Sequence, residues 1–140
     1  MLSRAHINKA VNDAIKTIFP TVPIQSSDIE EGFPRPSFYV SIETNSTQQY
    51  QFSIMRDMTC RIKYFPKDRN LNKEEVYDVQ DKLEMQFGLT LPVGDRVFTI
   101  DGAATEVVDK VLHFSFDFSY YESKDQAPEG PLMEELEFNG

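Results

Sequence analysis

Reactive and metal-binding side chains are scarce in this sequence of 140 residues, which contains one cysteine and two histidines. A single cysteine cannot form a disulfide within the chain, which fits a reducing compartment. One cysteine and two histidines are also too few for a structural zinc site of the usual composition. The six glycines are scattered and form no phosphate-binding loop. We therefore expect no metal and no cofactor.

Long apolar runs are missing as well. No stretch approaches the ~20 apolar residues that a transmembrane helix needs. Residues 1–19 have their apolar side chains at helical spacing, unlike the continuous apolar stretch of a signal peptide. We therefore expect no membrane partner. A chain of this length fits one domain, which buries roughly 68% of the surface of the unfolded chain.

Positive charge is in short supply and unevenly distributed. The chain has 14 Lys and Arg against 23 Asp and Glu, a net charge of −9. Residues 1–70 carry nine basic and seven acidic residues (net +2), whereas residues 71–140 carry five and sixteen (net −11). Gripping nucleic acid requires a basic patch that displaces counterions, so this balance argues against it. The polarity suits either head-to-tail contacts between like subunits or plain solubility with an acidic tail.

Two amphipathic helices are predicted from apolar residues at helical spacing. The first spans Ser3–Phe19, with Ser3 as its N-cap. The second begins at a capping-box pattern formed by Asn72 and Glu75, and Gly88 ends it.

Strands account for most of the rest. After a short extended piece at 24–29, alternation predicts a strand over 38–43, and a polar turn is expected at 45–49. A long strand follows over 50–65, with a bulge near 52–56.

Three further strands are predicted in the second half, over 96–100, 105–108 and 111–121. Asp101-Gly102 and Asp109-Lys110 are the expected turns between them. Every second residue from 112 to 120 in the last strand is Leu, Phe or Tyr. This is the heaviest apolar load in the chain, so we expect the strand to be central.

These elements predict an α+β fold, a two-layer domain over residues 1–121. A mainly antiparallel or mixed sheet of five to six strands carries both helices on one face. Residues 122–140 form an acidic C-terminal tail, which we expect to be loose. The other face of the sheet is polar and includes Arg61, Lys63, His113, Ser115, Asp117, Ser119 and Tyr121.

Candidate catalytic groups are better explained as structural. Cys60 has the same phase as apolar neighbours and is expected in the core, where a free cysteine packs as a small hydrophobe. His113, Ser115 and Asp117 share one face of a strand, but a pleated strand holds such groups roughly 7 Å apart, so they cannot converge as a triad. We therefore predict that the protein is not an enzyme.

One basic cluster stands out beside Tyr64 and Phe65, whose rings we expect to point inward. We expect this cluster to contact an acidic protein surface, such as the 122–137 tail of a neighbouring subunit. Its members are Arg61, Lys63, Lys67 and Arg69.

Several segments together resemble the tail-terminator family of long-tailed phages and of prophages of Gram-positive bacteria. The resemblance covers nearly the whole chain, and its matching residues are structural. The segments are Ile18-Phe19-Pro20, the run from Asp28 through Gly32-Phe33-Pro34-Arg35-Pro36 to Phe38, Tyr64-Phe65-Pro66, Val111-Leu112-His113-Phe114 and Met133-Glu134-Glu135-Leu136-Glu137.

The resemblance implies a virion protein that forms a ring, usually hexameric, on the last disc of the tail tube. Such a ring halts tube polymerisation and presents a surface to head-completion or connector proteins. It would assemble in the host cytoplasm, with itself and the tail-tube protein as partners. DNA would pass through without specific binding, since an acidic wall repels the duplex.

Two other hypotheses stay open at this point. One is a head–tail connector or tail-completion protein of the phage neck, and the other is an acidic regulator that mimics DNA. For the preferred reading, the strand analysis gives the candidate oligomer and partner interface. Its residues are Gln48, Tyr50, Arg61, Lys63, His113, Ser115, Asp117 and Tyr121.

Overall fold

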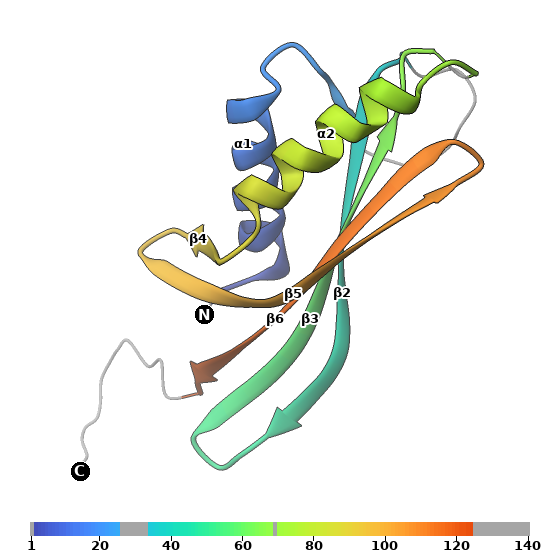
Figure 1. Cartoon of the computed structure of the whole chain (residues 1–140). Coiled ribbons are helices and arrows are strands. Elements are labelled where there is room, and N and C mark those ends of the chain that lie inside the picture. The colour runs from blue at the N-terminus through green and yellow to red at the C-terminus, as the bar shows by residue number, and fades with distance from the viewer. Residues whose placement is uncertain (1, 26–33, 69, 125–140) are drawn as a thin grey trace.

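Two helices lie on one face of a single curled sheet in the computed structural model, which describes residues 2–25, 34–68 and 70–124 (Figure 1). The elements are α1 (Arg4–Ile18), β1 (Ile24–Gln25), β2 (Ser37–Gln49), β3 (Ser53–Phe65), α2 (Lys73–Gln86), β4 (Thr90–Val93), β5 (Arg96–Val108) and β6 (Val111–Ser123). The strand order is β1-β2-β3-β6-β5-β4, with β1 parallel to β2 and every other neighbouring pair antiparallel. The predicted α+β class is confirmed.

Helix α1 begins where the sequence predicts because Ser3 caps it. The Ser3 hydroxyl accepts a hydrogen bond from the backbone N–H of His6 at 3.2 Å, and the Ser3 N–H donates to His6 Nδ1 at 3.3 Å. This reciprocal pair satisfies backbone donors that the helix itself leaves unpaired. The apolar stripe below it is fully buried and consists of Ile7, Val11 and Ile15.

Helix α2 buries the predicted stripe, but its N-terminus is held in another way. Asn72 occupies the N-cap position and makes no side-chain capping bond, so the predicted capping box is wrong. The Glu75 carboxylate instead accepts hydrogen bonds from the Tyr64 hydroxyl at 2.5 Å and from the Lys67 N–H at 2.7 Å. The first turn of α2 is thereby tied to the end of β3, a long-range contact that a local pattern does not reveal.

Gly88 follows the end of α2, and the reason for glycine there is steric. Phe87 caps the helix through a backbone bond to Leu83. A Cβ atom on Gly88 would lie 2.8 Å from the carbonyl oxygen of Glu84. Any other residue would therefore have to push the last turn of the helix aside.

Strand β6 lies inside the sheet between β3 and β5, as predicted. Its alternate side chains pack against the helices and against neighbouring rings. Phe87 stacks on Phe116 with centroids 5.1 Å apart, and Phe98 stacks on Phe118 at 5.7 Å. Each such buried side chain contributes about 1.5–3 kcal/mol through area removed from water. The buried residues of β6 are Leu112, Phe114, Phe116, Phe118, Tyr120 and Glu122.

The β2–β3 hairpin is longer than predicted and extends well beyond the helices (Figure 1). Residues 45–49, predicted as a turn, continue β2 and pair with β3, and the turn lies at 50–52. The predicted bulge in β3 is also wrong, because the register shift falls in β2 at Asn45. The arm is held by its backbone ladder, so its polar side chains stay exposed and give no alternating signal.

Two predicted strands are a single one in the structure. Strand β5 is continuous, and the expected Asp101-Gly102 turn is a register shift within it. Strand β4 was not predicted; it pairs with the start of β5 through a turn in which Gly94 has φ 61°. The Asp109-Lys110 turn is confirmed, with φ of 52° and 63° at the two residues, as a tight hairpin turn of the primed type requires.

The end of β6 lies two residues beyond the predicted strand and domain boundary. Glu122 is buried there. Its carboxylate accepts hydrogen bonds from Arg96 Nη1 and from the Leu2 N–H, each at 2.5 Å. It thus joins the N-terminus, β5 and β6. The predicted tail beyond Lys124 lies outside the described residues.

Replacing Leu83 by Ala should lower the free energy of unfolding by about 2–5 kcal/mol, because Leu83 is fully buried under the sheet and truncation leaves a cavity. Met85→Ala, on the same helix, is the control: Met85 is 86% exposed, so the change should stay within about 0.5 kcal/mol. Chemical denaturation of both variants measures this, and equal losses would contradict the placement of α2.

Candidate interaction surface

The sheet face turned away from the helices is the candidate interaction surface, and we call it the open face. It carries the odd-numbered residues of β3 and β6 and their register partners in β2 and β5. Serine is the most frequent residue on it, and charged groups and a few larger side chains lie between the serines. A face of this kind is compatible with water and leaves room for a partner to approach the backbone.

The predicted interface residues all lie on or beside the open face, in two groups. Register pairing places Lys63 beside His113 and Arg61 beside Ser115, and Asp117 follows one row further along. The second group lies at the far end of the same face and consists of Gln48, Tyr50 and Tyr121.

Two members of the predicted basic cluster, Arg61 and Lys63, share the open face. Arg61 pairs with Glu43 at 3.0 Å across β2 and β3, and Lys67 lies on the exposed segment after β3. Arg69 lies outside the described residues. The two aromatic rings point to opposite sides: Tyr64 joins the core as expected, whereas Phe65 is buried on the side of the open face, under Arg35.

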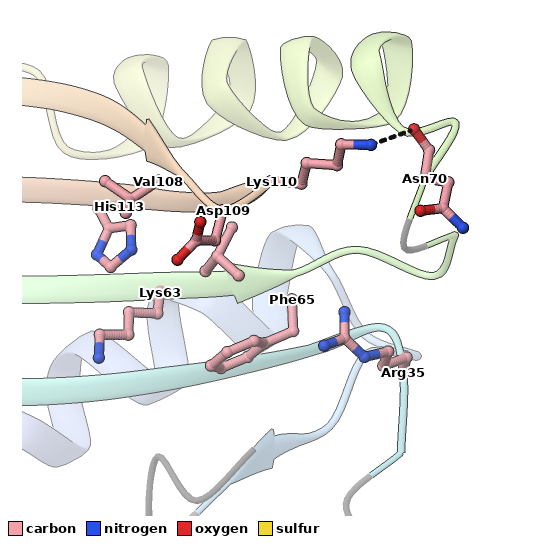
Figure 2. A pocket seen from close by; sticks show the side chains of 9 residues that line it. Arg35, Lys63, Phe65, Asn70, Val108, Asp109, Lys110 and His113 are labelled. Carbon is pink, nitrogen blue, oxygen red and sulfur yellow. Dashed lines mark hydrogen bonds between the residues drawn. The ribbon is translucent and has the colours of Figure 1, made fainter. Parts of the chain in front are cut away.

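Lys63 and His113 line a pocket at the end of the open face where β3 ends and β6 begins. Figure 2 shows both at one end of the pocket, Arg35 at the other and Phe65 between them. The volume is about 360 Å³. Sequence reasoning missed Arg35 and Lys110. Arg35 lies between two prolines and Lys110 lies in a turn, and no local pattern indicates that the two residues flank the same cavity.

His113 is held in its neutral form near pH 7. Partial burial lowers its pKa below the ordinary 6.5, and the nearby positive charge of Lys63 lowers it further. The carboxylate of Glu106, its register partner in β5, acts in the opposite direction, and Arg61 adds a smaller lowering effect. The pocket is therefore a positively charged environment around an uncharged imidazole.

A chain of hydrogen bonds crosses the middle of the open face. Asn45 Nδ2 donates to Thr59 Oγ1 at 2.7 Å, and Thr59 Oγ1 donates to Asp117 Oδ1 at 2.6 Å. The Asp117 carboxylate is thus engaged with β3, four residues along the strand from His113. This arrangement agrees with the argument that these residues do not form a triad.

Exposed aromatic side chains gather at the tip of the β2–β3 arm. Tyr50 and Tyr121 lie with ring centroids 6.4 Å apart, and the Tyr50 hydroxyl donates to Gln48 at 2.7 Å. Phe52, in the turn, is 68% exposed. Residues 44–53 contain no charged side chain. Apolar groups grouped at a protein surface in this way mark contact sites.

Among the described residues, both edges of the sheet are uncovered over long stretches. In the described part of the chain, β1 covers β2 only at Phe38 and Tyr39, so Val40–Gln49 pairs on one side only. At the other edge, β4 covers β5 as far as Thr99, and residues 101–108 pair only with β6. Neither stretch contains Lys, Arg or Pro, the residues that usually protect an edge strand, although each carries one bulge.

Neither a metal-binding cluster nor an accessible thiol is present in the described part of the chain. No group of three or more His, Cys, Asp or Glu side chains is placed among the described residues to hold a metal ion. Cys60 is fully buried, and burial raises the pKa of its thiol, so the thiolate is strongly disfavoured. The helices of the described part are all too short or too polar to cross a membrane.

A comparison with protein families gives a match over most of the chain. The family model described as phage tail terminator protein matches residues 6–130. The match takes in all six strands, helix α2 and all but the first two residues of α1. No curated protein matches the chain.

Cys60 should react with a thiol reagent roughly a thousandfold or more slowly in the native protein than in denaturant, because only the unfolded fraction exposes it. The rate of reaction with an aromatic disulfide reagent measures this. Ser46→Cys, on the exposed arm, provides the control and should react at once. Fast labelling of native Cys60 would contradict its place in the core.

Proposed function

Because this chain belongs to the phage tail terminator family, we propose that copies of it close into a ring at the head-proximal end of the tail tube. The family makes it a structural protein of the phage tail, with tail and head components as its partners. In our proposal the ring is a hexamer that stops tube polymerisation and offers its other side to the head-completion or connector protein.

The two uncovered sheet edges are the observation that supports a ring. Unpaired N–H and C=O groups along an edge strand form a template for another strand. One copy has two such edges, β2 on one side and β5 on the other, so each copy can accept a neighbour at both sides. Head-to-tail contacts of this kind make a closed ring when the rotations from each copy to the next add up to one full turn.

Strand direction is compatible with this pairing. Across the sheet, from β2 through β3 and β6 to β5, each of the three neighbouring pairs is antiparallel. Strands β2 and β5 therefore run in opposite directions. A rotation about an axis roughly along the strands preserves those directions. The β2 edge of one copy would therefore meet the β5 edge of the next in antiparallel fashion, which continues the pattern of the sheet.

The charges of the open face suit a channel through which DNA slides. Arg61 and Lys63 are offset by acidic side chains in neighbouring rows, and Arg61 is already paired with Glu43. Few phosphates could be neutralised by such a face, so a duplex would not be held. The acidic side chains concerned are Glu43, Asp57, Glu106 and Asp117.

Tails assembled without this protein should be longer and more variable than tails assembled with it, because nothing would stop addition of tube subunits. Electron microscopy of tails from phage with and without the intact gene measures the length distribution. A phage lacking only the head-completion protein is the control and should give tails of normal length. Unchanged lengths after loss of this protein would refute the proposal.

Thr47→Lys on the β2 edge, or Ala103→Lys on the β5 edge, should weaken self-association at least tenfold, about 1.4 kcal/mol, because a buried lysine disrupts edge pairing. Both residues are exposed in the single chain, so folding should be retained. Thr99→Lys is the matched control, since β4 already covers β5 there. Light scattering measures self-association, and electron microscopy measures tail lengths. Normal tail lengths with both variants would exclude these edges as the contact between copies.

A further inference from the structure

One helix contacts each of the two sheet edges that are uncovered in the described part of the chain, and both helices lie on the same face (Figure 1). Arg4, in the first turn of α1, donates from Nε to Thr44 Oγ1 on the β2 edge at 2.8 Å. Gln80, in the middle of α2, donates from Nε2 to Thr105 Oγ1 on the β5 edge, also at 2.8 Å. A copy that pairs its β2 edge with the β5 edge of a neighbour therefore also brings its α1 towards the neighbour's α2.

The spacing of the strands fits direct contact between these two helices. Helix α1 contacts β2, and α2 contacts β6, which is one strand in from the β5 edge. Across the contact between copies, β6 and β5 of one copy would be followed by β2 of the other, so the helix axes would lie two strand spacings apart, roughly 10 Å. Packed helices have axes about 8–10 Å apart. The helix layer as well as the sheet can therefore continue from one copy to the next.

The helix ends that would meet lie at one level of the sheet. Helix α1 begins beside Thr44, and the register across β3 and β6 places Thr44 level with Ile100 in β5. Helix α2 ends shortly before Leu89, whose carbonyl accepts a hydrogen bond from the Ile100 N–H at 2.9 Å. When neighbours pair at the same level, the first turn of α1 therefore faces the last turn of the neighbour's α2.

The charges at these two helix ends are the reverse of what an isolated helix prefers. The first turn of α1 carries Arg4 and no acidic residue, and the last turn of α2 carries Glu84 and no basic residue. A helix has partial positive charge at its N-terminus and partial negative charge at its C-terminus, so each side chain is unfavourable in its own helix. The other two ends follow the usual preference, with Glu74 and Glu75 at the start of α2 and Lys16 at the end of α1. The two exceptions are the two ends that would meet.

Arg4 and Glu84 are both exposed, and neither forms an ion pair among the described residues. Glu84 accepts a long hydrogen bond of 3.5 Å from Gln80 Nε2, and Arg4 binds the neutral hydroxyl of Thr44. Because Glu84 comes one turn after Gln80, it lies on the flank of α2 that faces the β5 edge. A guanidinium and a carboxylate placed opposite each other form a strong, charge-assisted hydrogen bond.

We propose that Arg4 of each copy forms an ion pair with Glu84 of the next copy around the ring, and that α1 packs there against the neighbour's α2. The inference rests on the ring of the proposed function and adds a second line of contact to the paired edges. A pair of edge strands is a narrow contact, whereas a specific interface buries about 1,200–2,000 Å². The helix contact enlarges the interface on the helix side and leaves the open face free to line the channel.

Charge reversal tests the ion pair. Arg4→Glu and Glu84→Arg should each weaken self-association by roughly tenfold or more, because like charges then face each other. The chain that carries both changes should associate to within about threefold of wild type, because the pair is restored with its signs exchanged. The matched control is Asp81→Arg, on the side of α2 that forms a groove with Ile18 of α1, and it should associate like wild type.

Light scattering measures self-association of these variants, and electron microscopy measures the lengths of the tails that they form. Both single changes remove an unfavourable charge from a helix end, so the melting temperature should not fall, which separates lost association from lost folding. A double variant that is as defective as the single variants overturns the proposal.

Cross-linking in purified tails separates this contact from the ring itself. One chain carries Arg4→Cys with Glu84→Cys, and a second carries Ser41→Cys with Ala104→Cys, two edge positions that are level in the sheet. Cys60 is buried and does not interfere. A short bifunctional maleimide should give a ladder of linked copies with either pair, and none with a chain that carries one change alone. A ladder from the edge pair only refutes the helix contact and leaves the ring; no ladder from either pair refutes the edge-paired ring as well.

Discussion

Burial of alternate side chains along β6 is the constraint on which the rest of the structure depends. Leu112, the three phenylalanines that follow at every second position, and Tyr120 pack on one side of the sheet, and the apolar stripes of α1 and α2 cover them. A period of two fixes the register, since a slip of one residue would turn this whole row to solvent. The two layers, the central place of β6 and the position of both helices follow from this one contact.

One-sided burial also explains what is left uncovered. Both helices pack on the same face. In the described part of the chain the opposite face therefore stays largely polar, and long stretches of both sheet edges pair on one side only. The β2–β3 arm extends past the helices because its backbone ladder needs no core beneath it. A protein built in this way places most of its unpartnered surface on one face, two edges and one arm, which is where an assembly protein needs it.

Electrostatics divides the open face into distinct regions. Paired or hydrogen-bonded charges, such as Arg61 with Glu43 and Asp117 with Thr59, occupy its middle. Positive charge is concentrated at the pocket end, and the uncharged aromatic tip of the arm lies at the other. Contacts at the two ends therefore have different chemistry.

The sequence by itself determined the fold class, both helices, the Ser3 cap, the Asp109-Lys110 turn, the core position of Cys60 and the central place of β6. Each of these rests on local periodicity, capping or turn preference. Only the tertiary structure decided that residues 45–49 extend a strand, that Asp101-Gly102 lies within one strand, that Glu75 binds Tyr64, and that Arg35 and Lys110 share a pocket with Lys63. These features depend on partners distant in the chain, and backbone pairing between polar residues leaves no periodic trace of burial in the sequence.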